Sequence, residues 1–294
     1  MPASIEVRIA AELSVKPQQV AAAVELLDGG ATVPFVARYR KEATGGLDDG
    51  QLRTLEERLI YLRELDERRA VILASIEDQK KLTPELRASI EAADTKQRLE
   101  DLYLPYKPKR RTKAQIAREA GLDGLAEALL ADRSLSPDIE AQKYLKPAFK
   151  TAEGDDNPGV PDTKAALEGA RAILVERFAE DAGLLAKLRD HLQKHGVIVS
   201  KVADGKEDAA AKFRDYFAYD EKLETVPSHR ALALFRGRKE DLLRVSLKLP
   251  EQLQAEETAA RDQPFNACER LIASRFEITD SKRPADTWLL QTVR

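Results

Sequence analysis

The sequence predicts a mainly α protein, a multi-helical array of antiparallel hairpins with a helix-turn-helix-like piece and a small antiparallel β ribbon. Hydrophobic residues make up 43% of the 294 residues and aromatic residues only 5%, which indicates a core of aliphatic side chains. Apolar residues recur at spacings of three and four along most of the chain, as on the buried face of amphipathic helices. An alternating pattern typical of strands first appears near residue 197.

The first third of the chain contains the clearest helical pattern. Two short helices are expected at residues 5–13 and 18–27, and a long amphipathic helix is opened by Asp48. A further helix, from Thr83 to about residue 93, should return antiparallel along the long one. We favour this hairpin over a coiled-coil oligomer because the heptads do not persist. The apolar face of the long helix consists of Leu52, Leu55, Leu59, Leu62, Leu65, Ile72 and Ile76.

Two basic clusters interrupt the helical pattern. In TVPFVARYRKEATGG, residues 32–46, Pro34 suits the first turn of a short helix, and we expect Phe35 and Val36 to face inward. The second cluster lies in an extended segment after Pro105, which ends another helix. The cations of the two clusters are the candidate nucleic-acid-binding residues Arg38, Arg40, Lys41, Lys107, Lys109, Arg110 and Arg111. The alternative is that they pair with acidic residues and lock helices together.

Residues 113–130 resemble a helix-turn-helix with Gly121 at its corner. Glu127 falls where the second helix of a DNA-reading motif usually places an apolar residue. We therefore favour an ordinary helical corner at this place over a motif that reads DNA.

The middle of the chain continues the helical pattern after an interruption. Residues 147–161 are expected to form an acidic surface loop, and its carboxylates lack the spacing of a calcium site. Two helices follow, one capped by Asp162 and one that ends at Gly196, and they should form a second hairpin.

The β ribbon is predicted from two segments, residues 197–202 and 242–249, which should pair antiparallel. An aromatic helix lies between them, followed by a helix that Ser228 caps and Gly237 ends. A third, smaller basic cluster at the exit of that helix contains Arg236, Arg238 and Lys239.

The sequence contains none of the common catalytic or nucleotide-binding motifs. No phosphate loop, dinucleotide fingerprint, zinc-protease helix or nucleophile elbow occurs, so we expect a non-catalytic protein without a cofactor or a bound metal. His191 and His195 share a helix face but lack a third ligand. Cys268 is the single cysteine, and this count excludes an intramolecular disulfide and fits a reducing compartment. We expect its side chain to be part of the core.

Charge and hydropathy restrict the partners. The net charge is −3, so binding to nucleic acid would have to come from a local patch of cations. The N-terminus lacks the apolar stretch of a secretory signal, and no run of about 18 apolar residues occurs. We therefore expect a cytoplasmic protein that does not contact a membrane.

Four segments together carry a resemblance to a known family. They are TVPFVARYRKEATGG, LEDLYLPYKPKRRTKAQIAREAGL, ALEGARAILVERFAED and VPSHRALALFRGR. In this order they resemble the N-terminal region of the bacterial Tex family of transcription accessory proteins, which is related to a eukaryotic transcription elongation factor and histone chaperone. The loop at residues 147–161 departs from the family pattern because it is longer and more acidic.

The resemblance implies the helical N-terminal module of a nucleic-acid-binding transcription protein. Family members continue into an RNase H-like domain without an evident catalytic set, helix-hairpin-helix elements and an S1-type fold that supplies most nucleic-acid affinity. We expect an N-terminal helical, helix-turn-helix-like subdomain at residues 1–66. Residues 67–294 should form a helical hairpin domain with the ribbon, cut off before the RNase H-like domain.

Two functions remain open from the sequence. The first is a non-catalytic scaffold whose basic clusters contact RNA or DNA phosphates, although the principal contacts would belong to domains outside this chain. The alternative is a protein interaction module that docks the transcription machinery without touching nucleic acid.

Overall fold

The computed structural model describes residues 3–258 and 265–294, and the chain divides into two structural units. Unit 1 is Met1–Lys107 and unit 2 is Pro108–Arg294. The boundary expected after residue 66 falls inside the longest helix, α4 (Asp49–Asp78), whose continuous backbone hydrogen bonding leaves no linker there. No helix in the described ranges is both long and apolar enough to cross a membrane.

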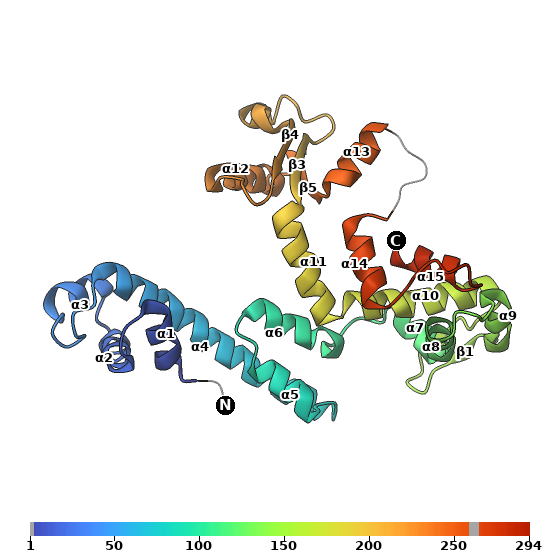
Figure 1. Cartoon of the computed structure of the whole chain (residues 1–294), viewed down its shortest axis with the longest axis horizontal. Helices are drawn as coiled ribbons and strands as arrows, with labels where there is room; N and C mark the ends of the chain where they lie inside the picture. The colour runs from blue at the N-terminus through green and yellow to red at the C-terminus, as the bar shows by residue number, and fades with distance from the viewer. Residues whose placement is uncertain (1–2, 259–264) are drawn as a thin grey trace. The chain divides into compact units, whose positions relative to one another are not determined.

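Unit 1 is built along α4. Figure 1 shows the first three helices gathered along one half of α4 and the last two helices near its other end. Asp48 and Gln51 form a capping box at the start of α4, which satisfies backbone donors in its first turn. The other helices of unit 1 are α1 (Ile5–Leu13), α2 (Pro17–Asp28), α3 (Val33–Tyr39), α5 (Pro84–Glu91), α6 (Lys96–Tyr103) and the 3-10 turn η1 (Leu104–Tyr106).

The apolar face of α4 forms the core of unit 1, as the sequence predicts. All seven of its predicted leucines and isoleucines are at most 4% exposed. They pack against buried side chains of the surrounding helices, among them Ile9, Val20, Val36, Ile90 and Leu99. One helical stripe therefore holds the five shorter helices of the unit.

The stripe contains a charged residue. Arg69 occupies the position between Leu65 and Ile72 and is only 6% exposed. Its Nε donates to the carbonyl oxygen of Ile90 at 3.2 Å, and its Nη2 donates to that of Ala93 at 2.8 Å. These carbonyls lie at the end of α5, where a cation is favourable because the helix dipole is negative. Further along both helices Arg87 of α5 pairs with Glu77 of α4 at 3.5 Å, which confirms that α5 runs back along α4 as an antiparallel hairpin.

In unit 2, α10 (Thr163–Ala179) is the central helix of the larger core, and a second, smaller core contains Ile198, Phe213, Leu234 and Leu243. The partner helix α7 (Lys113–Glu119) approaches α10 closely because Gly169 has no side chain, and a Cβ there would lie 3.2 Å from that of Ala117. The remaining helical elements are α8 (Asp123–Ala131), α9 (Pro137–Ala141), η2 (Gln142–Tyr144), α11 (Ala182–His195), η3 (Ala211–Tyr216), α12 (Ser228–Lys239), α13 (Pro250–Thr258), α14 (Ala267–Arg275) and α15 (Asp286–Val293). The sequence predicts a polar helix beyond Pro250, and its part within residues 259–264 lies outside the described residues.

The helical corner of unit 2 has the geometry expected from the sequence. Between α7 and α8, Gly121 adopts φ +88°, and its N–H donates to the carbonyl of Arg118 at 2.8 Å. The next N–H, from Leu122, donates to Ala117 at 3.0 Å, which completes a Schellman turn. By contrast, the predicted hairpin of α10 and α11 is wrong, because α11 packs against α14, where Asp181 pairs with Arg275 at 2.7 Å.

The predicted ribbon is part of a three-stranded sheet in the order β4-β3-β5. The central strand β3 (Val197–Val202) pairs antiparallel with β5 (Leu243–Lys248), with Val197 opposite Lys248. The additional strand is β4 (Ala218–Lys222), which the sequence does not predict because AYDEK carries too few apolar residues to give an alternating signal.

Two local expectations differ from the structure. The loop at residues 147–161 contains a short antiparallel hairpin of β1 (Phe149–Lys150) and β2 (Asp156–Asn157). Gly237 does not end α12 but lies buried inside it. The Leu243 side chain packs so closely that a Cβ at position 237 would lie 2.5 Å from it. The helix instead ends at Lys239, and Asp241, two residues later, lies in the left-handed region at φ 55°.

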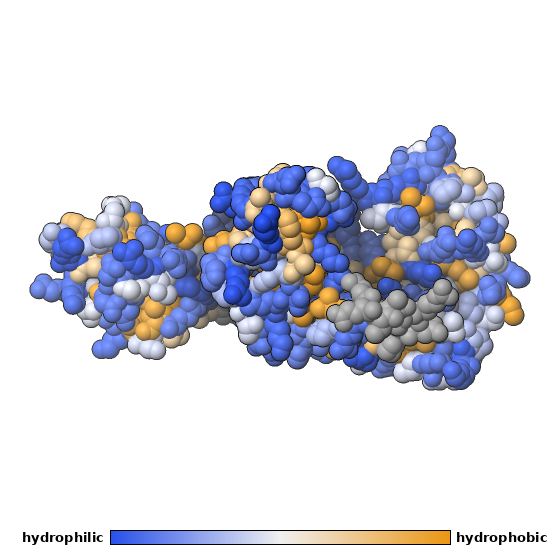
Figure 2. Space-filling view, turned by 90° about the horizontal axis from the view of Figure 1, so that it is seen from above, coloured by the Kyte–Doolittle hydropathy of each residue, from blue (hydrophilic) through white to orange (hydrophobic). Residues whose placement is uncertain are grey.

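The outer surface agrees with the high proportion of charged residues. Figure 2 shows a largely hydrophilic face on which hydrophobic residues form small separate groups. Most large apolar side chains of the described residues are instead found in the cores of the two units.

We predict that Arg69→Met lowers the free energy of unfolding of unit 1 by about 2–4 kcal/mol. The substitution keeps the volume of the side chain but removes the donors to the α5 carbonyls and the partner of Asp66. Hydrogen exchange in peptides from α4 and α5 should report the loss. Arg53→Met is the control, because Arg53 is 60% exposed and should change stability by less than about 0.5 kcal/mol. Equal stability of the two variants would contradict a stabilising role for Arg69.

Candidate nucleic-acid interface

The first basic cluster lies entirely in unit 1, at the end of α3 and in the turn that follows. α3 begins with Pro34 in its first turn, as expected, and anchors through Val33 and Val36, which are 3% and 0% exposed. The expectation that Phe35 faces inward is wrong, because Phe35 is 42% exposed. In a helix of seven residues only one face can contact the core, and the two valines, three residues apart, occupy it.

The turn after α3 is held in one conformation. The N–H of Gly46 donates to the carbonyl of Lys41 at 2.8 Å, and that of Gly45 donates to Glu42 at 3.2 Å, which is the pattern of a Schellman turn. Gly45 sits at its left-handed position with φ +62°, where a side chain would be strained. Thr44 is fully buried, and Gln19 of α2 donates to the carbonyl of Gly45 at 2.8 Å. The backbone under the cluster is therefore fixed from two sides.

The cations of this cluster are free of acidic partners. Arg38, Arg40 and Lys41 are all exposed, and within the described residues none of them makes an ion pair. Arg40 contacts only its own neighbourhood, donating to the carbonyl of Tyr39 at 3.2 Å and lying 5.4 Å from the Phe35 ring centre. Three positive charges thus project from a rigid turn, with Glu42 as the only carboxylate within residues 38–42.

The second cluster is mostly engaged in ion pairs. Lys109 contacts Glu176 at 3.2 Å and also pairs with Glu180, both on or next to α10. Arg118 binds the other oxygen of Glu176. Burial raises the pKa of Glu176, but the hydrogen bonds from Arg118 and Lys109 outweigh it and leave the pKa below the ordinary value. Lys109 therefore ties the segment before α7 to α10.

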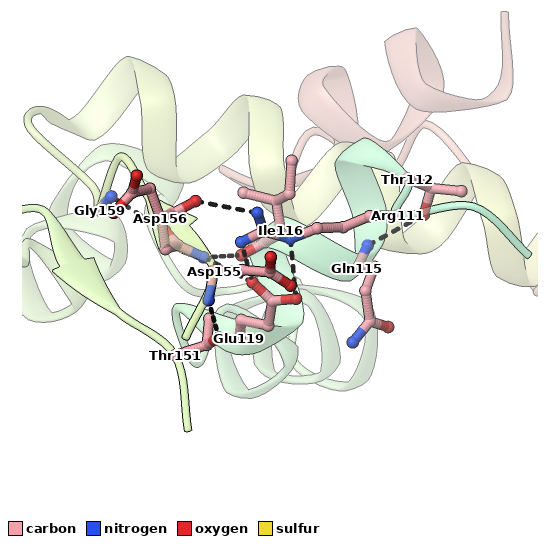
Figure 3. Close-up of polar contacts among 10 residues, drawn as sticks. Arg111, Thr112, Gln115, Ile116, Glu119, Thr151, Asp155, Asp156 and Gly159 are labelled. Atoms are coloured by element: carbon pink, nitrogen blue, oxygen red, sulfur yellow. Dashed lines mark hydrogen bonds and ion pairs between the residues drawn. The ribbon is translucent and has the colours of Figure 1, made fainter. Parts of the chain in front are cut away.

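Arg111 is held in the same way, as Figure 3 shows. Its Nε donates to Glu119 at 3.1 Å, and its Nη1 donates to the carbonyl of Asp156 at 2.9 Å. The hydrogen bond from Arg111 is the largest cause of the lowered pKa of Glu119. Asn157 is 2% exposed and donates to the carbonyl of Ile116 at 2.9 Å. The acidic loop is therefore anchored on α7 by the arginine that was a candidate phosphate ligand.

Two residues of the second cluster make no ion pair with any residue that the structure describes. Lys107 is the last residue of unit 1, and its charge contributes to the lowered pKa of Glu100, which is due first to the hydrogen bond from Arg68. Arg110 belongs to unit 2 and has no ion pair with any residue that the structure describes. The second cluster thus offers two unpaired cations, Lys107 in unit 1 and Arg110 in unit 2, whereas Lys109 and Arg111 are engaged in ion pairs.

The third cluster, on α12, combines charge with exposed apolar side chains. Arg236 pairs with Glu240 at 3.0 Å, whereas Arg238 and Lys239 make no ion pair among the residues described. Leu232 and Phe235 on the same helix are 69% and 51% exposed. The sequence predicts the charges but not the exposure of the apolar pair.

Other candidate chemistry is sparse in the described part of the chain. No group of three or more His, Cys, Asp or Glu side chains is placed there to hold a metal ion. The rings of His191 and His195 lie 4.7 Å apart between centres, as expected for neighbours on one helix face. Cys268 is partly buried, and burial is the largest cause of its raised pKa.

The fold and the clusters define a mainly helical protein with local cationic surfaces, and two family models match its sequence. The model described as Tex-like protein N-terminal domain matches residues 3–77, and the one described as Tex central region-like matches residues 132–294. The chain belongs to the Tex family.

The relatives are much longer than this chain. It is 55% identical over 283 residues to the transcriptional accessory protein Tex of Neisseria gonorrhoeae, covering 96% of this chain and 35% of that protein. It is 55% identical over 282 residues to protein YhgF of Escherichia coli, covering 95% and 34%. The human S1 RNA-binding domain-containing protein 1 is 28% identical over 250 residues, covering 83% and 24%. The chain thus spans about a third of the length of the bacterial relatives.

We predict that unit 2 becomes less stable in acid because Glu176 is protonated there and loses its ion pairs. The pKa of this carboxylate is lower in the folded state than its ordinary value of 4.5, so its stabilisation is complete above that value and is lost as the pH falls through the folded pKa. Glu176→Gln should be less stable than the parent at about pH 7, and the difference should vanish in acid. The fluorescence of Trp288, the single tryptophan, reports urea unfolding of unit 2. A difference that is independent of pH would contradict this account.

Proposed function

We propose that this chain is a non-catalytic helical module of a transcription accessory protein. We further propose that the α3 turn, the end of α3 and the turn after it with Arg38, Arg40 and Lys41, contacts the phosphate backbone of nucleic acid. The module would act in the cytoplasm as a scaffold for domains that lie outside these 294 residues. The names of its relatives, a transcriptional accessory protein and an S1 RNA-binding domain-containing protein, support the nucleic-acid context.

The observation that carries the proposal is the contrast between the two basic clusters. Lys109 and Arg111 are paired with carboxylates, so a phosphate would have to displace an existing ion pair. Arg38, Arg40 and Lys41 have no such competitor among the described residues, and their backbone is already fixed. Because the backbone is already ordered, binding of an anion has to order only the side chains, and it releases counterions from the nucleic acid.

We predict that replacing Arg38, Arg40 and Lys41 together by Ala weakens binding of this chain to single-stranded RNA. Three lost phosphate contacts should reduce the slope of log affinity against log salt by about 2. Fluorescence anisotropy with a labelled oligonucleotide, titrated at several salt concentrations, measures this slope.

The matched control removes three paired cations from the same unit. Arg53, Arg63 and Lys96 pair with Asp49, Asp28 and Glu64, so their replacement by Ala causes the same change in net charge. This control should leave the slope almost unchanged. If both triple variants shift the slope equally, general electrostatics explains the binding and the α3 turn is not a phosphate site.

A second function, docking of the transcription machinery, is favoured by α12. Leu232 and Phe235 are exposed beside Arg236 and Lys239, and clustered apolar side chains with a charged rim are typical of protein interfaces. The charge of this surface suits an acidic protein partner.

We expect Leu232→Glu with Phe235→Glu to abolish capture of bacterial RNA polymerase by the chain in nuclease-treated extracts. The paired control is Val71→Glu, since Val71 is 53% exposed on α4 of unit 1, whereas α12 belongs to unit 2. Equal capture of polymerase by all variants would rule out α12 as the docking surface.

A further inference from the structure

Two aromatic rings stand on the exposed face of α3. Phe35 and Tyr39 are 42% and 61% exposed, and their ring centres are 5.4 Å apart with a tilt of 47°. They are four residues apart, so they lie on the same helix face, away from the buried Val33 and Val36. The core of unit 1 does not use this pair.

Arg40 completes the arrangement. Its guanidinium lies 5.4 Å from the Phe35 ring centre, and its Nη1 is held by the carbonyl of Tyr39. The plane of Arg40 therefore covers part of Phe35, and the ring of Tyr39 remains the more accessible of the two. Arg38 and Lys41 flank these rings in sequence and are exposed.

Aromatic faces next to unpaired cations match the chemistry of a single nucleic-acid strand. Bases in a single strand expose flat faces that stack on Tyr, Phe or Arg planes, while their phosphates require positive charge. In a duplex the bases are already stacked on each other, so only the phosphates remain available to such a surface. A protein segment could cover the rings, but three unpaired cations around only two rings favour a polyanion.

We propose that α3 is a base-stacking platform for single-stranded nucleic acid, with Tyr39 as the principal stacking ring and the Phe35–Arg40 pair behind it. This inference rests on the proposed phosphate contacts of Arg38, Arg40 and Lys41 and adds a preference for unpaired bases. The platform is sequence-tolerant, because every base has a face that can stack.

The test compares two oligonucleotides of equal length and charge, a uridine homopolymer and an abasic strand, on the intact 294-residue chain. The parent should bind the uridine strand about tenfold more tightly than the abasic strand, the scale expected for one stacked base. Tyr39→Ala should reduce the uridine affinity to the abasic level and leave abasic binding unchanged. Phe35→Ala should have a smaller effect, and Tyr39→Phe should restore the preference because the ring is retained.

The variants separate this inference from the proposed function. The triple replacement of Arg38, Arg40 and Lys41 should weaken binding to both strands, since both carry phosphates. If it does so while Tyr39→Ala changes the affinity for neither strand, phosphate contact stands and the stacking platform is overturned. If Tyr39→Ala lowers the affinity for both strands equally, or Tyr39→Phe fails to restore binding, stacking is likewise overturned. If the triple variant binds like the parent, the phosphate contacts and the platform that rests on them both fail. Circular dichroism of each variant checks that the chain keeps its overall helix content.

Discussion

The burial of one apolar stripe on α4 is the interaction on which unit 1 depends. Each buried leucine or isoleucine contributes about 1.5–3 kcal/mol relative to an exposed one, and seven of them lie in a row along a single helix. No helix of eight or nine residues, such as α1 or α5, is stable alone in water, so each exists because α4 offers it an apolar face. Arg69 interrupts the stripe and is tolerated because the carbonyls at the end of α5 need donors.

The same residue types serve opposite purposes in the two basic clusters. Arg111 and Lys109 find carboxylates from other segments of the chain, and their charges fix the loop and α10 around α7. The cations at the end of α3 and in the turn after it are exposed and make no ion pair with any described residue, although Glu42 is close to them in sequence. Placement relative to carboxylates, which only the fold determines, therefore separates structural cations from those available to a ligand.

Much of the fold could be predicted from periodicity, and most of the candidate site could not. Local sequence patterns are enough to predict three features: the stripe from Leu52 to Ile76, the corner at Gly121 and the pairing of β3 with β5. β4 gives no such pattern because its sequence is mostly polar and its partner lies near residue 200. Gly237 is ambiguous in the sequence because glycine serves both at helix ends and where a strand residue, here Leu243, packs tightly. The exposure of Phe35 depends on which face of a very short helix meets the core, which the sequence alone does not specify.

The turn after α3 also has a consequence for how this chain can change over evolutionary time. A Cβ on Gly45 would lie 2.9 Å from Nε2 of Gln19, the same atom that donates to the Gly45 carbonyl. Positions 19 and 45 are 26 residues apart, yet neither can be altered freely while the other stays. A substitution at Gln19, inside an otherwise ordinary helix, would therefore remove a hydrogen bond that holds the turn under the cations.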